Sequence, residues 1–257
     1  MSTQMQVPFG LINAVKSRQV VLFAGAGISF KSINVGALTL RDALGAEIQG
    51  NYPGYDFSKR SIEDVCDEYA ALSDRISLVN RLASLIPRSA APLASHLAAV
   101  KTFRFIVTTN WDLLFEAAYS QINQGYQCLA SEADAPNFSY DQHNLLKIHG
   151  TADRPLTLIA TSDDYENYND KHPLLLQRIT DLLHQNTVLF VGYGLRDEHV
   201  RHLLAHIRRE RGEWANKNYA IGFYDDVRTK LLESRGIEVL PYDAADFLPE
   251  LAKRAGV

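Results

Sequence analysis

Cysteine is scarce in this sequence. Only Cys66 and Cys128 occur among 257 residues, and their separation fits neither a set of metal ligands nor a redox pair. We therefore expect no structural zinc, no other bound metal and no disulfide framework. Both thiols are interpreted as buried side chains and not as reactive groups.

Long hydrophobic runs are also missing. No apolar stretch reaches the 18 or more residues that a membrane-spanning helix needs, and residues 1–4 lack the basic and apolar regions of a secretory signal. We expect a cytoplasmic protein that does not bind membranes. The formal charge of −4 gives no reason to expect nucleic-acid binding, and the basic stretch 206–211 is interpreted as a solvated helix end.

An apolar content of 46% and a charged content of 22% allow one substantial core. Short β-rich stretches alternate with segments of helical periodicity. Strands are expected at residues 20–23, 103–107, 144–148, 187–191, 219–223 and 237–240, and helices at 9–16, 113–121 and 227–234. The alternation predicts an α/β, Rossmann-like, mostly parallel sheet with helices on both faces. The expected organisation is a single domain of residues 1–257 with a helical insertion at about 38–99.

Four of the expected strands end in polar or glycine-rich loops. Since ligands of parallel sheets bind outside the carboxyl ends of the strands, the four loops are expected to face one crevice. The first loop, Gly25-Ala26-Gly27-Ile28-Ser29, resembles a phosphate-binding turn. It lacks the third glycine of the dinucleotide fingerprint, because Phe30 stands there, so a tight structural turn is the alternative.

The loop at 108–112 carries hydroxyl, amide and carboxylate groups at the start of a helix. Asn110 and Asp112 could cap the helix, or they could bind a ribose and position a water molecule. His149 ends another strand, and its ordinary pKa range suits a general base as well as a structural histidine. The residues alone leave both alternatives open.

Taken together, the motifs at 25–29, 108–112 and 147–150 occur in the order seen in sirtuins. The stretches 161–165 and 191–197 further resemble the bacterial SIR2-like branch, and the resemblance covers most of the chain. It implies that NAD is bound, with no zinc. The residues that the resemblance assigns to NAD are Gly25, Ala26, Gly27, Ser29, Thr109, Asn110, Asp112, His149, Gly192, Tyr193, Gly194 and Asp197.

Within that set, Gly25, Ala26, Gly27 and Ser29 would line the phosphates, and Asn110, Asp112 and His149 would surround the nicotinamide ribose. Gly192, Tyr193 and Gly194 would approach the adenosine half. Asp197 matches an acidic position of the branch, although an N-cap of a following helix explains it equally well.

Two features depart from the protein-deacylating sirtuins. No cysteine follows Cys128, so the paired cysteines of their zinc module are missing, and residues 30–36 lack their proline-aspartate-phenylalanine-arginine element. Both departures argue against a peptide substrate. We therefore expect hydrolysis of the nicotinamide glycosidic bond of NAD, with Asn110, Asp112 and His149 as the catalytic residues.

Two other activities remain open, namely NAD-dependent protein deacylation or ADP-ribosylation, and non-catalytic sensing of NAD or ADP-ribose. The resemblance further implies an effector of antiphage defence that forms a homo-oligomer and responds to a trigger or a regulatory partner. A last cluster, His199, His202 and His206, has helical spacing. Because arginines are interleaved and no carboxylate is in register, it is interpreted as a solvated helix flank and not as a metal site.

Overall fold

Seven parallel strands form the central sheet of the protein. The structure is a computed structural model that describes residues 5–193, 205, 209 and 217–257. The strands lie in the order β3-β4-β2-β1-β5-β6-β7, and all six neighbouring pairs are parallel. The strands are β1 (Val20–Ala24), β2 (Phe105–Thr108), β3 (Tyr126–Leu129), β4 (His143–Lys147), β5 (Thr187–Val191), β6 (Asn218–Ile221) and β7 (Ile237–Leu240). This confirms the predicted Rossmann-like class.

Helices cover both faces of the sheet, as the side chains of β1 illustrate. All five are buried; Val20, Leu22 and Ala24 belong to one hydrophobic core, whereas Val21 and Phe23 belong to the other. This alternation is what a strand buried on both faces requires. The first core includes α1 (Phe9–Lys16), α6 (Ala94–Thr102), α7 (Leu114–Gln121) and α13 (Ala244–Ala255), and the second includes α10 (Pro173–Gln185) and α12 (Asp226–Ser234).

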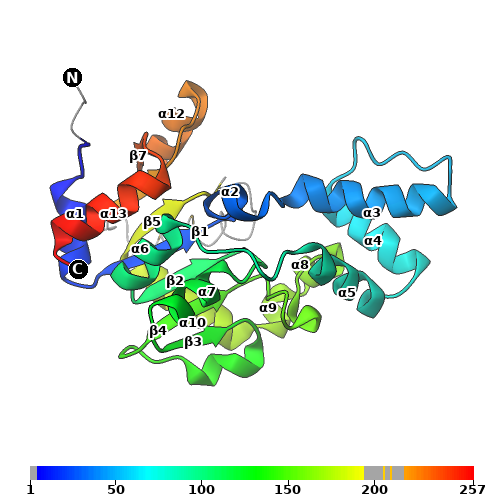
Figure 1. Cartoon of the computed structure of the whole chain (residues 1–257), viewed down its shortest axis with the longest axis horizontal. Coiled ribbons are helices and arrows are strands. Elements are labelled where there is room, and N and C mark those ends of the chain that lie inside the picture. The colour runs from blue at the N-terminus through cyan, green and yellow to red at the C-terminus, as the bar shows by residue number, and fades with distance from the viewer. Residues whose placement is uncertain (1–4, 194–204, 206–208, 210–216) are drawn as a thin grey trace.

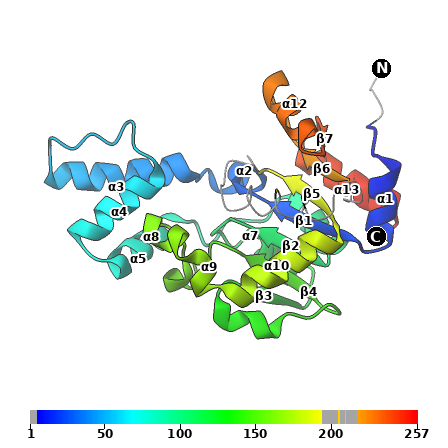
Figure 2. The same ribbon diagram turned by 180° about the vertical axis from the view of Figure 1, so that it is seen from behind.

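Three helices of the expected insertion project to one side of the sheet (Figures 1 and 2). They are α3 (Ala37–Asn51), α4 (Ile62–Leu72) and α5 (Arg75–Leu85). Their apolar faces form a third core, which continues onto Ala152, Leu158 and Ala160 in the segment after β4. Helix α6, by contrast, packs against α7 and α13 beside the sheet. The division of the chain into one domain with an insertion at 38–99 stays a prediction.

Several elements are not predicted by the sequence pattern. Strand β3 has four residues, of which only the last is buried, so it lacks an apolar run. Helix α10 is also not among the expected helices, although its sequence carries a helical signal: Pro173 stands in its first turn, and its buried residues recur at helical spacing. The other short elements are η1 (Ala26–Ile28), α2 (Phe30–Ile33), η2 (Glu132–Asn137), η3 (Pro155–Thr157), α8 (Ser162–Glu166) and α9 (Tyr168–Lys171).

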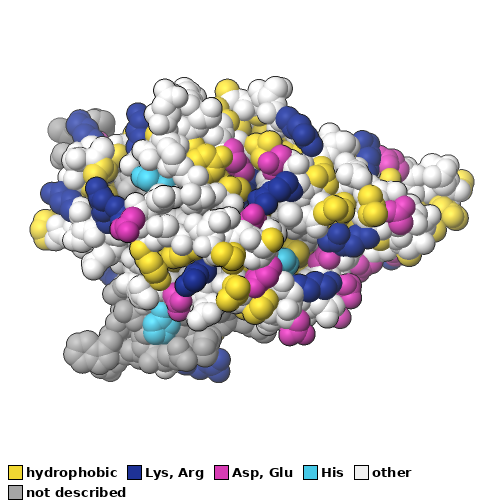
Figure 3. Space-filling model, turned by 90° about the horizontal axis from the view of Figure 1, so that it is seen from below, with side chains coloured by type: hydrophobic (Ala, Val, Ile, Leu, Met, Phe, Trp, Pro, Cys, Tyr) yellow, Lys and Arg dark blue, Asp and Glu magenta, His cyan; other side chains and the backbone are white. Residues whose placement is uncertain are grey.

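The surface carries charges of both signs. On the face shown in Figure 3, Lys and Arg side chains are interspersed with Asp and Glu. Ion pairs in the projecting helices and in the connection before α4 include Arg41–Asp42, Arg60–Glu68 and Arg81–Glu47. Among the helices in the described part of the chain, none combines the length and apolar character that crossing a bilayer requires.

Candidate active site

Four loops of the candidate site leave the sheet from a single row of residues. Lys147, Thr108, Ala24 and Val191 are register partners across β4, β2, β1 and β5. Because the strands are parallel, the loops that follow these residues emerge on the same edge of the sheet. The structure therefore places the four loops of the sequence analysis side by side, as expected for a ligand crevice of an α/β fold.

The glycines of the first loop allow it to pack closely against the loop after β5. The Gly25 amide donates to the Val191 carbonyl (3.0 Å), and the Gly27 amide donates to the Gly192 carbonyl (2.8 Å). A Cβ atom on Gly27 would lie 2.8 Å from Gly192 Cα, which is closer than real Cβ contacts allow. Gly192 itself has a φ of +60°. The glycines thus serve loop-to-loop packing, and their amides are already engaged within the protein.

Asn110 connects the second loop to the first. Its Nδ2 donates to the Gly25 carbonyl (3.2 Å) and to Ser29 Oγ (3.1 Å). The Gly25 carbonyl can only accept a hydrogen bond, so it determines which side of the amide bears the nitrogen. Asn110 Oδ1 is buried and has no hydrogen-bond partner among the described residues. A buried acceptor in this state is available to a hydroxyl group or a water molecule.

Ser29 is fully buried and also contacts His96, from α6, through an Oγ–Nε2 distance of 3.3 Å. The Leu93 amide donates to His96 Nδ1 (3.2 Å), so the neutral ring carries its proton on Nε2 and donates it to Ser29. Ser29 Oγ therefore accepts two hydrogen bonds, one from His96 and one from Asn110. The hydroxyl proton of Ser29 remains as a donor for a third group.

His96 is held in its neutral form by its surroundings. Burial lowers the pKa of His96 to about 4, although the nearby Asp112 charge acts in the opposite direction. The ring also packs edge-on against Phe115, with 5.0 Å between centroids. The hydrogen-bond directions inferred for Ser29 therefore apply throughout the neutral pH range.

Asp112 makes the helix cap that the sequence offered as one of two roles, and its ribose-binding role stays a prediction. Its Oδ1 accepts from the Leu114 amide (3.0 Å) at the start of α7, which is a capping interaction. Its charge is nevertheless felt at His96, across the site. Asn110, by contrast, makes no cap: its side chain points to the first loop. Thr109 directly precedes Asn110, and its amide donates to the Ala24 carbonyl (3.3 Å).

His149 is buried near the start of the loop after β4, with 8% of its surface exposed. Its carbonyl accepts from the Ile159 amide (3.1 Å), and its ring meets the edge of Tyr165 with 5.3 Å between centroids. Gly150 follows with a φ of +79°, and a Cβ there would lie 2.1 Å from the Thr157 carbonyl oxygen. The backbone around His149 is thus tightly constrained.

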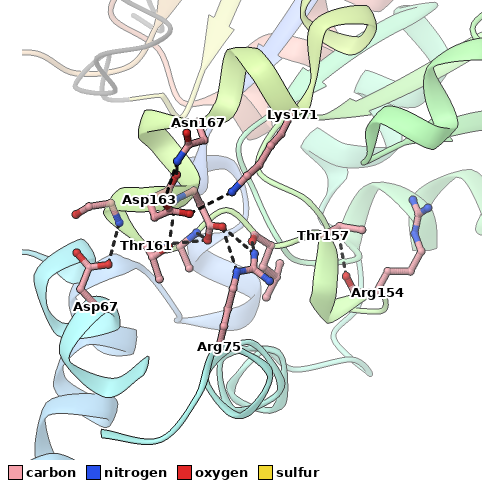
Figure 4. A network of polar contacts seen from close by, with 12 residues as sticks. Asp67, Arg75, Arg154, Thr157, Thr161, Asp163, Asn167 and Lys171 are labelled. Atoms are coloured by element: carbon pink, nitrogen blue, oxygen red, sulfur yellow. Dashed lines mark hydrogen bonds and ion pairs between the residues drawn. The ribbon is translucent and has the colours of Figure 1, made fainter. Parts of the chain in front are cut away.

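The segment that carries Tyr165 is attached to the projecting helices (Figure 4). Asp164 is buried and accepts from Arg75 Nη2 (2.9 Å), while the Ser162 amide donates to Asp67 (3.0 Å). Burial alone would raise the pKa of Asp164, but backbone donors and Arg75 hold it below its ordinary value. The motif at 161–165 therefore forms a junction between α4, α5 and the loop of His149.

The predicted residues after β5 are described only as far as Tyr193, which lies against Gly25 of the first loop. Tyr193 is described and packs against Phe23, with 4.9 Å between ring centroids. Gly194 and Asp197, like the histidines of the cluster at 199–206, lie outside the described residues. Sequence reasoning missed His96 and Lys147. Two signals were available: the prolines in the segment before α6, and a lysine inside an apolar strand.

The two thiols have raised pKa values. Burial raises the pKa of Cys66 to about 12 and that of Cys128 to about 11. Both therefore stay protonated at neutral pH and are poor nucleophiles. Within the part of the chain that the structure describes, no group of three or more His, Cys, Asp or Glu side chains could hold a metal ion.

The family model of the SIR2-like domain matches residues 104–240, which is more than half of the chain. The chain belongs to the SIR2-like domain family. The matched region of this SIR2-like domain starts beside β2 and ends with β7. It therefore contains Asn110, Asp112 and His149, whereas the glycine loop after β1 and His96 lie before it.

Three curated relatives match the SIR2-like domain. Defense-associated sirtuin 2 of Bacillus subtilis is 23% identical over 211 residues, which cover 80% of this chain and 21% of the relative. NAD(+) hydrolase ThsA of Enterococcus faecium is 31% identical over 121 residues, 44% of this chain and 24% of the relative. NAD(+) hydrolase ThsA of Acinetobacter baumannii is 24% identical over 219 residues, which cover 82% of this chain and 44% of the relative. The chain thus spans less than half the length of each relative.

Solved sirtuin structures share the fold. One, described as the structural basis for sirtuin substrate affinity, has a TM-score of 0.51 at 12% identity and covers 97% of this chain and 99% of that chain. A second, Sir2 bound to acetylated peptide, has the same score and identity, with coverages of 95% and 97%. At this level of identity the likeness concerns the fold alone.

Proposed function

We propose that this SIR2-like domain is an NAD glycohydrolase, which cleaves the nicotinamide glycosidic bond to give nicotinamide and ADP-ribose. The observation that carries the proposal is the Asn110 network: one buried amide joins the glycine loop to the loop after β2 and keeps a free acceptor oxygen. Two of the relatives are named as NAD(+) hydrolases. We assign the same chemistry to this chain.

In the proposed reaction, the bond from the ribose C1′ to the nicotinamide nitrogen breaks and water adds to C1′. The bonding pair leaves with nicotinamide, and the proton of the attacking water goes to a base and then to solvent. Asp112 would stabilise the positive charge that develops on the ribose. Asn110 Oδ1 would orient the water, and His149 would accept a proton from water or from a ribose hydroxyl, each contributing about 10²- to 10⁴-fold.

NAD binding would use the four loops of the candidate site. We assign Gly25, Ala26, Gly27 and Ser29 to the phosphates, with Ser29 acting through its uncommitted hydroxyl proton, and Asn110, Asp112 and His149 to the nicotinamide ribose. Thr109 is also assigned to NAD binding. Gly192 and Tyr193, with Gly194 and Asp197 further along the chain, are assigned to the adenosine half.

The proposal is tested by measuring nicotinamide release from NAD by the wild type, Asn110→Ala and His149→Ala. His143→Ala is the matched control, because His143 starts β4 whereas His149 follows its end, so the two lie at opposite edges of the sheet. Release that falls at least about 10²-fold in both site variants, but not in the control, is expected. Release that depends on an acylated peptide would instead favour deacylation or ADP-ribosylation, and NAD binding without turnover would favour a sensor.

We further propose that the chain acts in antiphage defence as a cytoplasmic homo-oligomer that responds to a trigger or a regulatory partner. The support is the name of the Bacillus subtilis relative, a defense-associated sirtuin. Cellular NAD should then fall during phage infection in cells that carry the wild-type protein, but not in cells that carry His149→Ala. A constant NAD level in both would contradict the defence role.

A further inference from the structure

A buried lysine lies directly behind the candidate site. Lys147 is the last residue of β4, a strand between β2 and β3, and its side chain is 1% exposed. Its ammonium group contacts the Asp112 carbonyl (2.5 Å), Glu116 Oε1 (2.7 Å) and Thr151 Oγ1 (3.0 Å). An ammonium group has three N–H donors, so these three contacts satisfy it fully, and the Trp111 carbonyl lies further away at 3.5 Å.

The three contacts belong to three different elements. Asp112 lies in the loop after β2, Glu116 in α7, and Thr151 in the loop after β4. Lys147 thereby joins the loop of Asn110 and Asp112 to the loop of His149. Near this lysine, the two loops also share the hydrogen bond from the Ala152 amide to the Trp111 carbonyl (2.9 Å).

The loop after β4 transmits this anchoring toward His149. Thr151 is fully buried, donates its hydroxyl to Asp153 (2.6 Å), and receives the lysine on the same oxygen. Its amide donates to Thr157 Oγ1 (3.0 Å). A shift of Thr151 would therefore move the backbone two residues from His149.

Stability alone does not require a charge at this position. Two charges removed from water lose much of their hydration, and a buried ion pair can often be replaced by apolar side chains of similar volume without loss of stability. Removal of one partner is different, because it leaves the other charge buried and unpaired. The lysine supplies a geometry that an apolar side chain cannot, because its three N–H groups donate in fixed directions to three elements.

We propose that Lys147 is a positioning residue for the reaction, which sets the placement of Asp112 relative to His149 by bonding to both of their loops. This inference rests on the proposed NAD glycohydrolase activity. Among the described residues, Lys147 donates to the loop after β2, to α7 and to Thr151, whereas the glycine loop and Gly192 are held by hydrogen bonds to each other. Lys147 should therefore affect turnover far more than NAD binding.

The experiment uses the double variant Lys147→Met/Glu116→Leu, which removes both charges together, beside the single variant Lys147→Met. Lys217→Met is the matched control, because it removes a lysine paired with Glu238 (2.5 Å) at the start of β6, on the opposite edge of the sheet. Four quantities are measured: the melting temperature, Kd for NAD, kcat for nicotinamide release, and amide hydrogen exchange at 111–114 and 149–152.

The single variant is expected to lose stability, and the double variant to recover it. The double variant should bind NAD with a Kd within about threefold of the wild type, while kcat falls about 10²-fold, the cost of a small misplacement of catalytic groups. Exchange at 111–114 and 149–152 should accelerate. The control should match the wild type in all four quantities.

A stable double variant with wild-type kcat and unchanged exchange would overturn the inference and leave the proposed function intact. Equal losses of NAD binding and kcat would also overturn it, since they indicate a general structural role. A wild type that binds NAD but releases no nicotinamide would contradict the proposed function, and the role of Lys147 in that reaction would fall with it. The exchange data would then report only whether the lysine orders the two loops.

Discussion

Acid should weaken this protein through His96, and the effect can be isolated with a single substitution. The ring is completely buried, its Nδ1 accepts from the Leu93 amide, and its Nε2 bonds to Ser29. A proton added at Nδ1 would place this N–H donor against the Leu93 amide, which is also a donor. The perturbation is a change from about pH 7.5 to about pH 5, applied to the wild type and to His96→Gln, which keeps an N–H donor but does not titrate.

The sign and size follow from the two pKa values of His96. Burial lowers its pKa from 6.5 to about 4 in the folded chain. Between these values the unfolded chain binds a proton that the folded chain does not, so the free energy of unfolding falls as the pH falls below 6.5. At about pH 5 the loss amounts to about 2 kcal/mol, and it approaches about 3 kcal/mol below pH 4.

Urea unfolding at the two pH values measures this loss. His96→Gln should lose about 2 kcal/mol less than the wild type over the same pH change, whatever its stability at neutral pH. His143 and His172 also have pKa values lowered by burial, but they are present in both proteins and cancel in the comparison. Equal losses in the two proteins would refute the assignment of His96 as a neutral donor to Ser29.

Two further substitutions test the loops and the junction. Gly27→Ala should destabilise the protein by about 1–3 kcal/mol in urea unfolding, because its Cβ would meet the backbone of Gly192, whereas Gly50→Ala has open space and should not. Arg75→Met should lower the free energy of unfolding by about 1–3 kcal/mol and raise the pKa of Asp164. Stability that depends on ionised Asp164 is lost as the pH falls through its folded pKa, so acid unfolding monitored by circular dichroism should begin at a higher pH than in the wild type.

The elements that position the site could be predicted because their sequence signals are local. Residues 187–191 and 237–240 are strands with the predicted bounds, and the short apolar run at 20–23 extends by one residue. The strands at 20–24 and 187–191 are buried on both faces, which requires continuous apolar runs, whereas 237–240 is only partly buried and contains Glu238. Asn110 could be placed beside the glycine loop because both follow neighbouring parallel strands, although which groups it would bond could not be predicted.

His96 and Lys147 could not be predicted as members of the site, since their partners are distant in sequence. His96 contacts Ser29 across 67 positions, and Lys147 contacts Asp112 across 35. A lysine inside an apolar strand and prolines before α6 mark the two positions in the sequence, but they do not identify the partners of either side chain. The interpretation of the glycine loop as a phosphate cradle was similarly local, and it did not anticipate that the amides of Gly25 and Gly27 bond to the loop after β5.

A buried carboxylate is one of the links between the helical insertion and the candidate base. Asp164 accepts from Arg75 of α5 and from the Ala160 and Thr161 amides, and its neighbour Tyr165 meets the ring of His149 edge-on. Breaking the ion pair would leave a buried charge with fewer donors, so α5 and this segment are expected to move together. Any displacement of the projecting helices would then reach the His149 ring through a short, packed path, whereas the Asn110 network is anchored on the sheet itself.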